Sequence, residues 1–184
     1  MNKKGLNEYK KVENKSGKAE WIYTGAYYVL PCNDKEFKKL KLVYVFMSVL
    51  NFVITMLMGF IDPNSLRTLY VLIPYVVVLL FVFIMLIKAT EFYFTPSRMT
   101  YRQKEKTVSS LYISVRVLYI SVIVFLICHI VFLFLGKSLL QDFFLVPLIV
   151  CIIVFSRYLL LKSKKYPCIK EGSALAEKST YIDK

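Results

Sequence analysis

The sequence predicts an all-α integral membrane protein, with four transmembrane helices packed in a bundle. Three observations predict this class. Of the 184 residues, 57% are hydrophobic, and the mean hydropathy is +0.54, whereas a soluble domain is about 45–50% apolar. The apolar residues gather in four long runs, and the basic residues gather in the segments between and beside these runs. A soluble fold of this length has no core large enough to bury such an excess.

The four predicted spans are about 42–61, 69–87, 112–135 and 139–161. A run of about 20 residues covers roughly 30 Å as a helix, which matches the hydrocarbon thickness of a bilayer. The last two spans are predicted to form a tight hairpin. Gly136 adopts the left-handed conformation at little cost and ends one helix, and Ser138 with Gln141 forms a capping box that starts the next.

Capping residues mark the other predicted helix starts. Asn33, with Glu36 in the capping-box position, starts the first helix, and Asn64 or Ser65 starts the second. Thr100 with Gln103 forms a third capping box. The third helix is therefore expected to begin near Thr100, well before the membrane.

The predicted organisation has four parts. Residues 1–18 form a disordered, basic N-terminal tail, because they offer little apolar surface to bury. Residues 19–33 form an aromatic segment, either extended or hairpin-like at the membrane surface or packed as a small cytosolic cap on the helix ends. Residues 34–165 form the transmembrane domain, and residues 166–184 form a flexible C-terminal tail.

The distribution of charge predicts the orientation. Residues 1–41 carry a net charge of +5, residues 88–116 carry +4, and residues 157–184 carry +4, whereas the two remaining turns are neutral. With four spans, nearly all basic residues fall on one side of the membrane. The positive-inside rule then places both termini and the middle loop in the cytoplasm.

The sequence lacks the residues that are characteristic of several classes of function. The basic residues sit at the ends of apolar runs and form no basic face on a polar domain, so no nucleic-acid partner is expected. The four cysteines form no C-x-x-C pair, and no clustered histidines or acids suggest a metal site. No P-loop motif is present. We therefore expect no enzyme activity, no metal and no cofactor.

Four polar residues inside the predicted spans are the candidate intramembrane site, since such residues are often functional: Asn51, Thr55, His129 and Asp142. His129 and Asp142 lie at similar depths on either side of the hairpin, so a contact between them is possible, and such a pair would relay a proton or bind a cation. The simpler interpretation is that His129 bonds a neighbouring helix and Asp142 caps its own. Asn51 and Thr55 share one helix face, and they either line a path for a solute or hold neighbouring helices together.

Aromatic and basic residues outside the spans are the candidate contacts with lipid or with a protein partner. They are Trp21, Tyr23, Tyr27, Tyr28, Arg98, Arg102, Lys104 and Lys106. Tyrosines at the ends of the spans, such as Tyr44 and Tyr75, are expected to belong to an interfacial aromatic belt.

Three stretches together resemble small four-span membrane proteins of Gram-positive bacteria. They are Trp21-Ile-Tyr-Thr-Gly-Ala-Tyr-Tyr28, Tyr70-Val-Leu-Ile-Pro-Tyr75 and Arg98-Met-Thr-Tyr-Arg-Gln-Lys104. The resemblance covers most of the chain. It implies a bacterial plasma membrane and implies no chemistry.

Two functions are compatible with these observations. The first is a non-enzymatic accessory or interaction protein of the cell membrane, whose basic segments suit anionic lipid or a partner. The alternative is a small transporter or channel that uses the intramembrane polar residues. Four helices enclose little volume, so the alternative requires a homo-oligomer.

Overall fold

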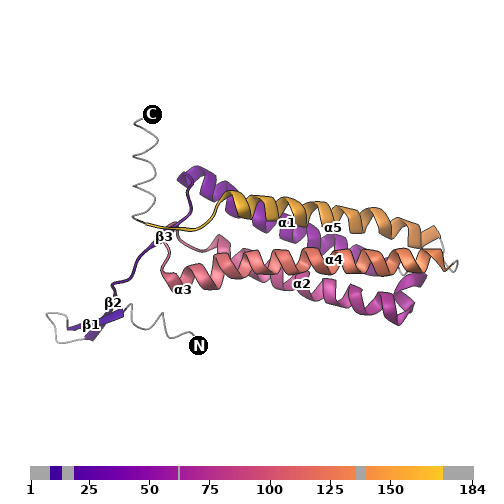
Figure 1. Ribbon diagram of the computed structural model, residues 1–184, viewed down its shortest axis with the longest axis horizontal. Helices are drawn as coiled ribbons and strands as arrows, with labels where there is room; N and C mark the ends of the chain where they lie inside the picture. Colours follow the sequence, from indigo (N-terminus) through magenta and orange to yellow (C-terminus); the bar gives the residue numbers. More distant parts are fainter. Residues whose placement is uncertain (1–8, 14–18, 62, 136–139, 172–184) are drawn as a thin grey trace.

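Four helices of the computed structural model are long and apolar enough to cross a membrane: Asp34–Phe60, Leu69–Tyr93, Tyr101–Phe134 and Asp142–Lys165. The structure describes residues 9–13, 19–61, 63–135 and 140–171, without the side chains of 9–13, 19–23 and 141. The four helices lie side by side along their length (Figure 1). Their number agrees with the four predicted spans.

The first helix, α1, covers Asp34–Phe60, and a short 3-10 helix, η2 (Asn64–Arg67), leads into α2, Leu69–Tyr93. The next helix begins as α3 (Tyr101–Lys104), continues through a π-helical turn, η3 (Glu105–Ser109), and runs on as α4, Ser110–Phe134. The last helix, α5, covers Leu140–Lys165. α1 packs on α2, α2 on α4, α4 on α5 and α5 on α1, so the helices follow one another around a common core.

The core is a seam of buried positions that recur at alternating spacings of three and four residues. In α4 these positions are Leu111, Val115, Leu118, Val122, Phe125, His129 and Phe132. Such spacing keeps one stripe of a helix facing its neighbours along the whole length. The opposite faces expose large apolar side chains, including Phe46, Leu80, Ile120 and Val154. A surface of this kind suits lipid and not water.

A small β structure joins three distant segments at one end of the helices. Strand β3 (Tyr28–Val29) pairs antiparallel with β4 (Ile169–Lys170), and Tyr28 also exchanges two backbone hydrogen bonds with Met99. We call β3, β4 and Met99 the β-cap. The end of the helices that carries it is the capped end, and the other is the distal end.

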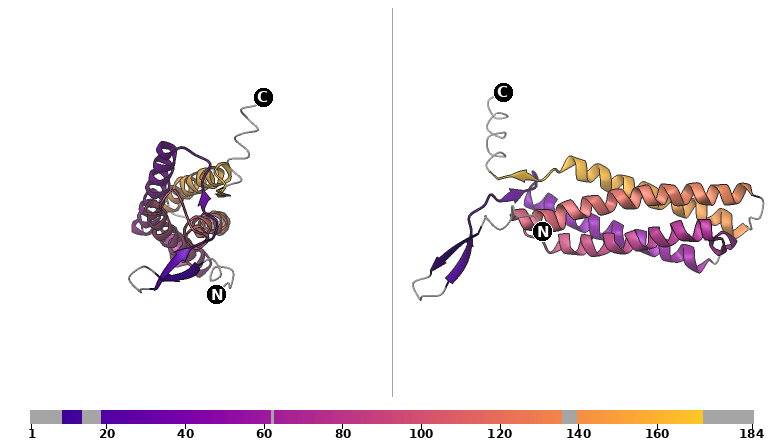
Figure 2. Two further views of the ribbon diagram at one scale, coloured as in Figure 1. Left: turned by 90° about the vertical axis from the view of Figure 1, so that its left-hand side faces the viewer. Right: turned by 60° about the horizontal axis from the view of Figure 1, so that its bottom comes forward.

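A separate hairpin precedes the β-cap. Strand β1 (Tyr9–Glu13) pairs antiparallel with β2 (Ala19–Tyr23). The hairpin lies beyond the capped end and away from the long helices, as the right-hand view of Figure 2 shows.

The structure corrects the predicted organisation at both ends of the chain. Residues 9–13 were expected in a disordered tail, but they form β1, because the extended aromatic segment of β2 supplies a pairing partner. Residues 166–184 were expected to form a flexible tail, but Ile169 and Lys170 form β4 on the edge of β3. The rest of both predicted tails, residues 1–8, 14–18 and 172–184, lies outside the described residues.

The capping predictions have mixed outcomes. The box at Thr100 is present in full, since its hydroxyl accepts from the Gln103 N–H at 3.3 Å and its own N–H donates to Gln103 Oε1 at 3.0 Å. Asn33 occupies the N-cap position of α1, but its side chain makes no capping bond. The predicted caps at Gly136 and Ser138 lie outside the described residues.

Candidate functional site

The distal end contains a polar cluster built from three separate helices. His129 in α4 and Asp142 in α5 are fully buried, as is Ser65 in η2. His129 Nε2 lies 2.9 Å from the backbone carbonyl oxygen of Asp142. The Asp142 carboxylate oxygen Oδ1 accepts a hydrogen bond of 2.8 Å from the backbone N–H of Ser65. The two residues therefore meet, but the imidazole contacts the backbone of Asp142.

This geometry assigns a proton to His129. A carbonyl oxygen only accepts, so Nε2 must carry the hydrogen, and the other ring nitrogen, Nδ1, is then a bare acceptor in the neutral ring. Nδ1 is buried and has no hydrogen-bond partner among the described residues. The Phe125 ring lies one turn away at 6.3 Å between ring centres. The imidazole therefore joins α4 to α5 through Nε2, and its Nδ1 remains an unused acceptor buried between the helices.

Asp142 makes a contact that the sequence did not predict. The simpler interpretation of the sequence was that it caps its own helix. Its carboxylate accepts from an N–H near the start of η2, which a helix start leaves without an internal acceptor. Asp142 therefore ties the connection between α1 and α2 to the start of α5. Sequence patterns did not select Ser65 for this contact, because the bond uses its backbone and spans 77 residues.

Asn51 and Thr55 form a second polar group, nearer the middle of α1. The Thr55 hydroxyl donates to the Asn51 carbonyl at 2.8 Å, and the Tyr75 hydroxyl of α2 donates to the Thr55 carbonyl at 3.0 Å. Neither the nitrogen nor the oxygen of the Asn51 side-chain amide has a partner in the described part of the chain, although Asn51 is fully buried. In the described part of the chain, no hydrogen bond joins this group to His129 or Asp142.

Two tyrosines expected in an interfacial belt are instead buried between the helices. Tyr75 is buried against Gly59, where an added Cβ would lie 2.6 Å from its hydroxyl oxygen. Tyr44 is fully buried, and its hydroxyl donates to the Leu159 carbonyl of α5 at 3.1 Å. The belt prediction is wrong for these two because both side chains occupy seam positions. A hydroxyl buried there needs an acceptor, which the facing backbone supplies.

The candidate contact residues near the β-cap fall into two groups. Arg98 binds Glu171 through 2.8 Å bonds from Nε to Oε1 and from Nη2 to Oε2, and it lies over the Tyr27 ring. Glu171 also donates its N–H to the Tyr27 carbonyl, and its carboxylate raises the pKa of Arg98. Lys104 lies over the Tyr28 ring, with Nζ 4.2 Å from the ring centre. These residues hold the β-cap together.

The second group faces outward. Arg102 and Lys106 are exposed on the helix that leaves the β-cap. Trp21 and Tyr23 belong to β2, and their side chains lie outside the described residues. Sequence reasoning missed Glu171, which no local pattern links to Arg98, 73 residues earlier.

No group of three or more His, Cys, Asp and Glu side chains gathers within the described ranges. Compared with known proteins, the chain matches no family model, no curated relative and no solved structure. Its function must therefore be argued from its own residues.

Proposed function

We propose that this chain is a non-enzymatic accessory or interaction protein of the bacterial plasma membrane. Its four helices would form a transmembrane bundle with both termini in the cytoplasm. One observation carries the proposal: the β-cap gathers the N-terminal segment, the α2–α3 connection and the segment after α5 at one end of the helices. A structured surface built from three segments suits contact with another protein.

The charge of these segments supports the orientation. The three segments that meet at the capped end are the three that carry net charges of +5, +4 and +4. Basic segments beside membrane spans are retained on the cytoplasmic side. The resemblance to four-span proteins of Gram-positive bacteria supports the choice of membrane.

The buried polar groups support a structural and not a catalytic use of the helices. His129, Tyr44 and Tyr75 each bond a backbone carbonyl of a facing helix, and Asp142 accepts from a backbone N–H. Interhelical bonds of this kind join helices in membranes. Catalysis would need a nucleophile, a base and a charge-stabilising group at one place.

The proposed contact surface consists of the β1–β2 hairpin with Trp21 and Tyr23, together with the outward-facing Arg102 and Lys106. Native mass spectrometry of the protein, extracted in mild detergent from its own membrane, tests it. We expect a second polypeptide at fixed stoichiometry, which is lost when residues 1–24 are deleted. A matched deletion of residues 1–8 leaves the hairpin and should retain the partner. Retention of the partner without residues 1–24 would contradict the proposed surface.

A small oligomeric transporter or channel is the alternative, and one specific observation favours it. The Asn51 amide and the His129 Nδ1 are buried without partners among the residues that the structure describes, and such groups could bind a solute or a proton. Proton flux into liposomes distinguishes the two functions. Flux that is lost in Asn51→Leu and His129→Leu, together with a homo-oligomer and no second polypeptide, would replace the accessory function by transport. Unchanged flux in His129→Leu and Asp142→Asn would remove the proton-relay hypothesis.

A further inference from the structure

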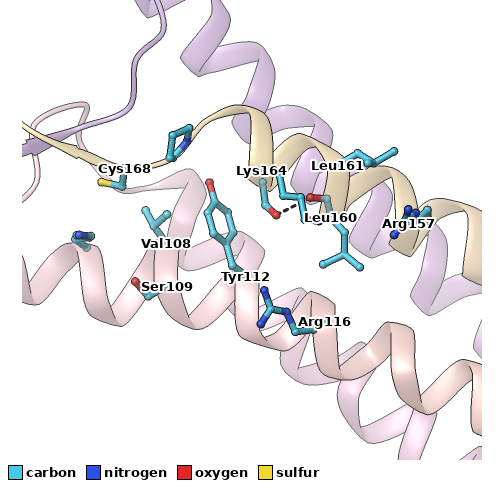
Figure 3. A pocket seen from close by; sticks show the side chains of 12 residues that line it. Val108, Ser109, Tyr112, Arg116, Arg157, Leu160, Leu161, Lys164 and Cys168 are labelled. Carbon is cyan, nitrogen blue, oxygen red and sulfur yellow. Dashed lines mark hydrogen bonds between the residues drawn. The ribbon is translucent and has the colours of Figure 1, made fainter. Parts of the chain in front are cut away.

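A cavity of about 590 Å³ lies between the start of the α4 helix and the end of α5, close to the β-cap (Figure 3). One wall comes from η3 and the first turns of α4, and the facing wall comes from the last turns of α5 and the chain after it. Its size falls within the range of ordinary ligand pockets, about 300–1,000 Å³. Neither the polar cluster at the distal end nor the proposed contact surface includes it.

Basic side chains dominate the polar lining of this cavity. Lys104 and Arg116 come from one wall, and Arg157 and Lys164 come from the other, while no aspartate or glutamate lines it. Within the described ranges, no carboxylate forms an ion pair with Arg116, Arg157 or Lys164. Four cations around one hollow repel one another. An anion placed between the two walls would relieve that repulsion.

A serine adds a hydroxyl donor to the same cavity. Ser109 lies in the π-helical turn η3 and lines the cavity. The Ser163 hydroxyl, in the last turns of α5, already donates to the Leu160 carbonyl at 2.8 Å. π-helical turns inside α-helices occur frequently at functional sites. The cavity thus offers both guanidinium and hydroxyl donors, which are the groups that bind phosphate oxygens.

The surroundings of the two arginines indicate what kind of anion fits. Ile120 follows Arg116 by one helical turn, and Val154 precedes Arg157 by about one turn, so both lie deeper along the helices than the arginines. Ile120 and Val154 are each 55% exposed on the apolar outer faces of the helices. Leu161, which lines the cavity, is 52% exposed as well. The basic hollow therefore opens onto apolar, lipid-facing surface, as an amphiphile with an anionic head requires.

We propose that this cavity binds the phosphate headgroup of an anionic membrane phospholipid. Arg116 and Arg157 bind the phosphate from opposite walls, Lys104 and Lys164 add positive charge at the rim, and the acyl chains lie along Ile120 and Val154. Basic pockets between transmembrane helices on the cytoplasmic side bind anionic lipid headgroups. The site goes beyond the proposed function, since it requires no protein partner.

The test compares lipid retention by the full chain in detergent, measured by native mass spectrometry with added phosphatidylglycerol or phosphatidylcholine. We expect the wild type to retain phosphatidylglycerol preferentially. The double variant Arg116→Gln/Arg157→Gln should lower that preference by about tenfold or more, since each basic group near a lipid surface contributes about 1 kcal/mol. The double variant Arg116→Lys/Arg157→Lys should keep part of it. Circular dichroism checks that each variant retains its helices.

The matched control is Lys38→Gln/Lys39→Gln, which removes two exposed positive charges near the start of α1, at the same end but outside the cavity. It should keep the preference for phosphatidylglycerol. An equal loss in both double variants would mean general charge attraction and would overturn the site, as would equal retention of both lipids by the wild type. Displacement of the lipid by millimolar inorganic phosphate would assign the cavity to a soluble anion. The experiment on the protein partner measures a second polypeptide and not a lipid, so the contact surface and the lipid site can be contradicted independently.

Discussion

His129 Nε2 lies 2.9 Å from the carbonyl oxygen of Asp142, and this bond joins α4 to α5 at the distal end. The Asp142 carboxylate continues the connection to Ser65 in η2. One imidazole and one carboxylate thus join three helical elements through backbone groups. A proton relay would instead bring the imidazole and the carboxylate together, and the observed geometry favours a structural role.

Removal of the imidazole should therefore weaken packing at the distal end. We expect His129→Phe to lower the free energy of unfolding by about 0.6–1.7 kcal/mol, the range measured for interhelical hydrogen bonds in membranes. His129→Gln keeps an N–H donor and should lose less. Thermal unfolding in detergent, followed by circular dichroism, measures both. Equal losses in the two variants would contradict a role based on the hydrogen bond.

Gly59 should tolerate a side chain only when the Tyr75 hydroxyl is absent. A Cβ at this position would lie 2.6 Å from that hydroxyl oxygen but 3.6 Å from the ring carbon that carries it. We expect Gly59→Ala to destabilise the protein by about 1–3 kcal/mol through overpacking. In a Tyr75→Phe background the same substitution should cost much less.

A double-mutant cycle of thermal unfolding measures this coupling between α1 and α2. Additive effects of Gly59→Ala and Tyr75→Phe would mean that the two helices do not approach as described. A separate loss in Tyr75→Phe alone is expected, since it removes the bond to the Thr55 carbonyl.

Asn51→Leu should stabilise the isolated protein. Both polar atoms of the Asn51 amide are buried without partners within the described ranges, and an unsatisfied buried polar group costs about 1–3 kcal/mol. Leucine has a similar size and removes that cost. Thermal unfolding measures the change, with Ser48→Ala as a control whose hydroxyl already has an acceptor in the Tyr44 carbonyl. Destabilisation by Asn51→Leu would indicate that the amide bonds to a second copy or to a solute.

The orientation can be tested with the two cysteines of the capped end. Cys32 precedes α1, and Cys168 precedes β4. In variants that retain only one of them, a membrane-impermeant maleimide should label the cysteine in opened cells but not in intact cells. Labelling of intact cells would place the capped end outside.

The same labelling should be slow at neutral pH. Burial raises the pKa of both thiols, and Glu36 and Asp34 raise that of Cys32 further. A raised pKa lowers the fraction of reactive thiolate, so the rate should increase as the pH rises above 8. The raised pKa also makes stability depend on pH, because both thiols lose their protons more readily in the unfolded chain than in the folded one. Below pH 9 the thiols are protonated and their contribution to the stability of the folded state is present. This contribution is lost as the pH rises further. Labelling of Cys168 that is as fast at pH 7 as that of a short cysteine peptide would contradict its burial.

The sequence by itself determined the number of long apolar helices, their approximate limits and the start of the third helix at Thr100. These properties depend on local composition, on length and on capping groups a few residues apart, which the chain displays directly. It also selected His129 and Asp142 as a possible pair, because the short hairpin sets their depths.

Only the tertiary structure decided how these residues are used. The bonds from Asp142 to Ser65, from Tyr44 to Leu159 and from Arg98 to Glu171 each span more than 70 residues. The facing helices and the β-cap bring these groups together, and two of the bonds use backbone atoms that every residue has. Patterns of side chains along the sequence therefore do not predict such contacts. The basic cavity has the same origin, since Arg116 and Arg157 come from two helices that only the packing of α4 on α5 places face to face.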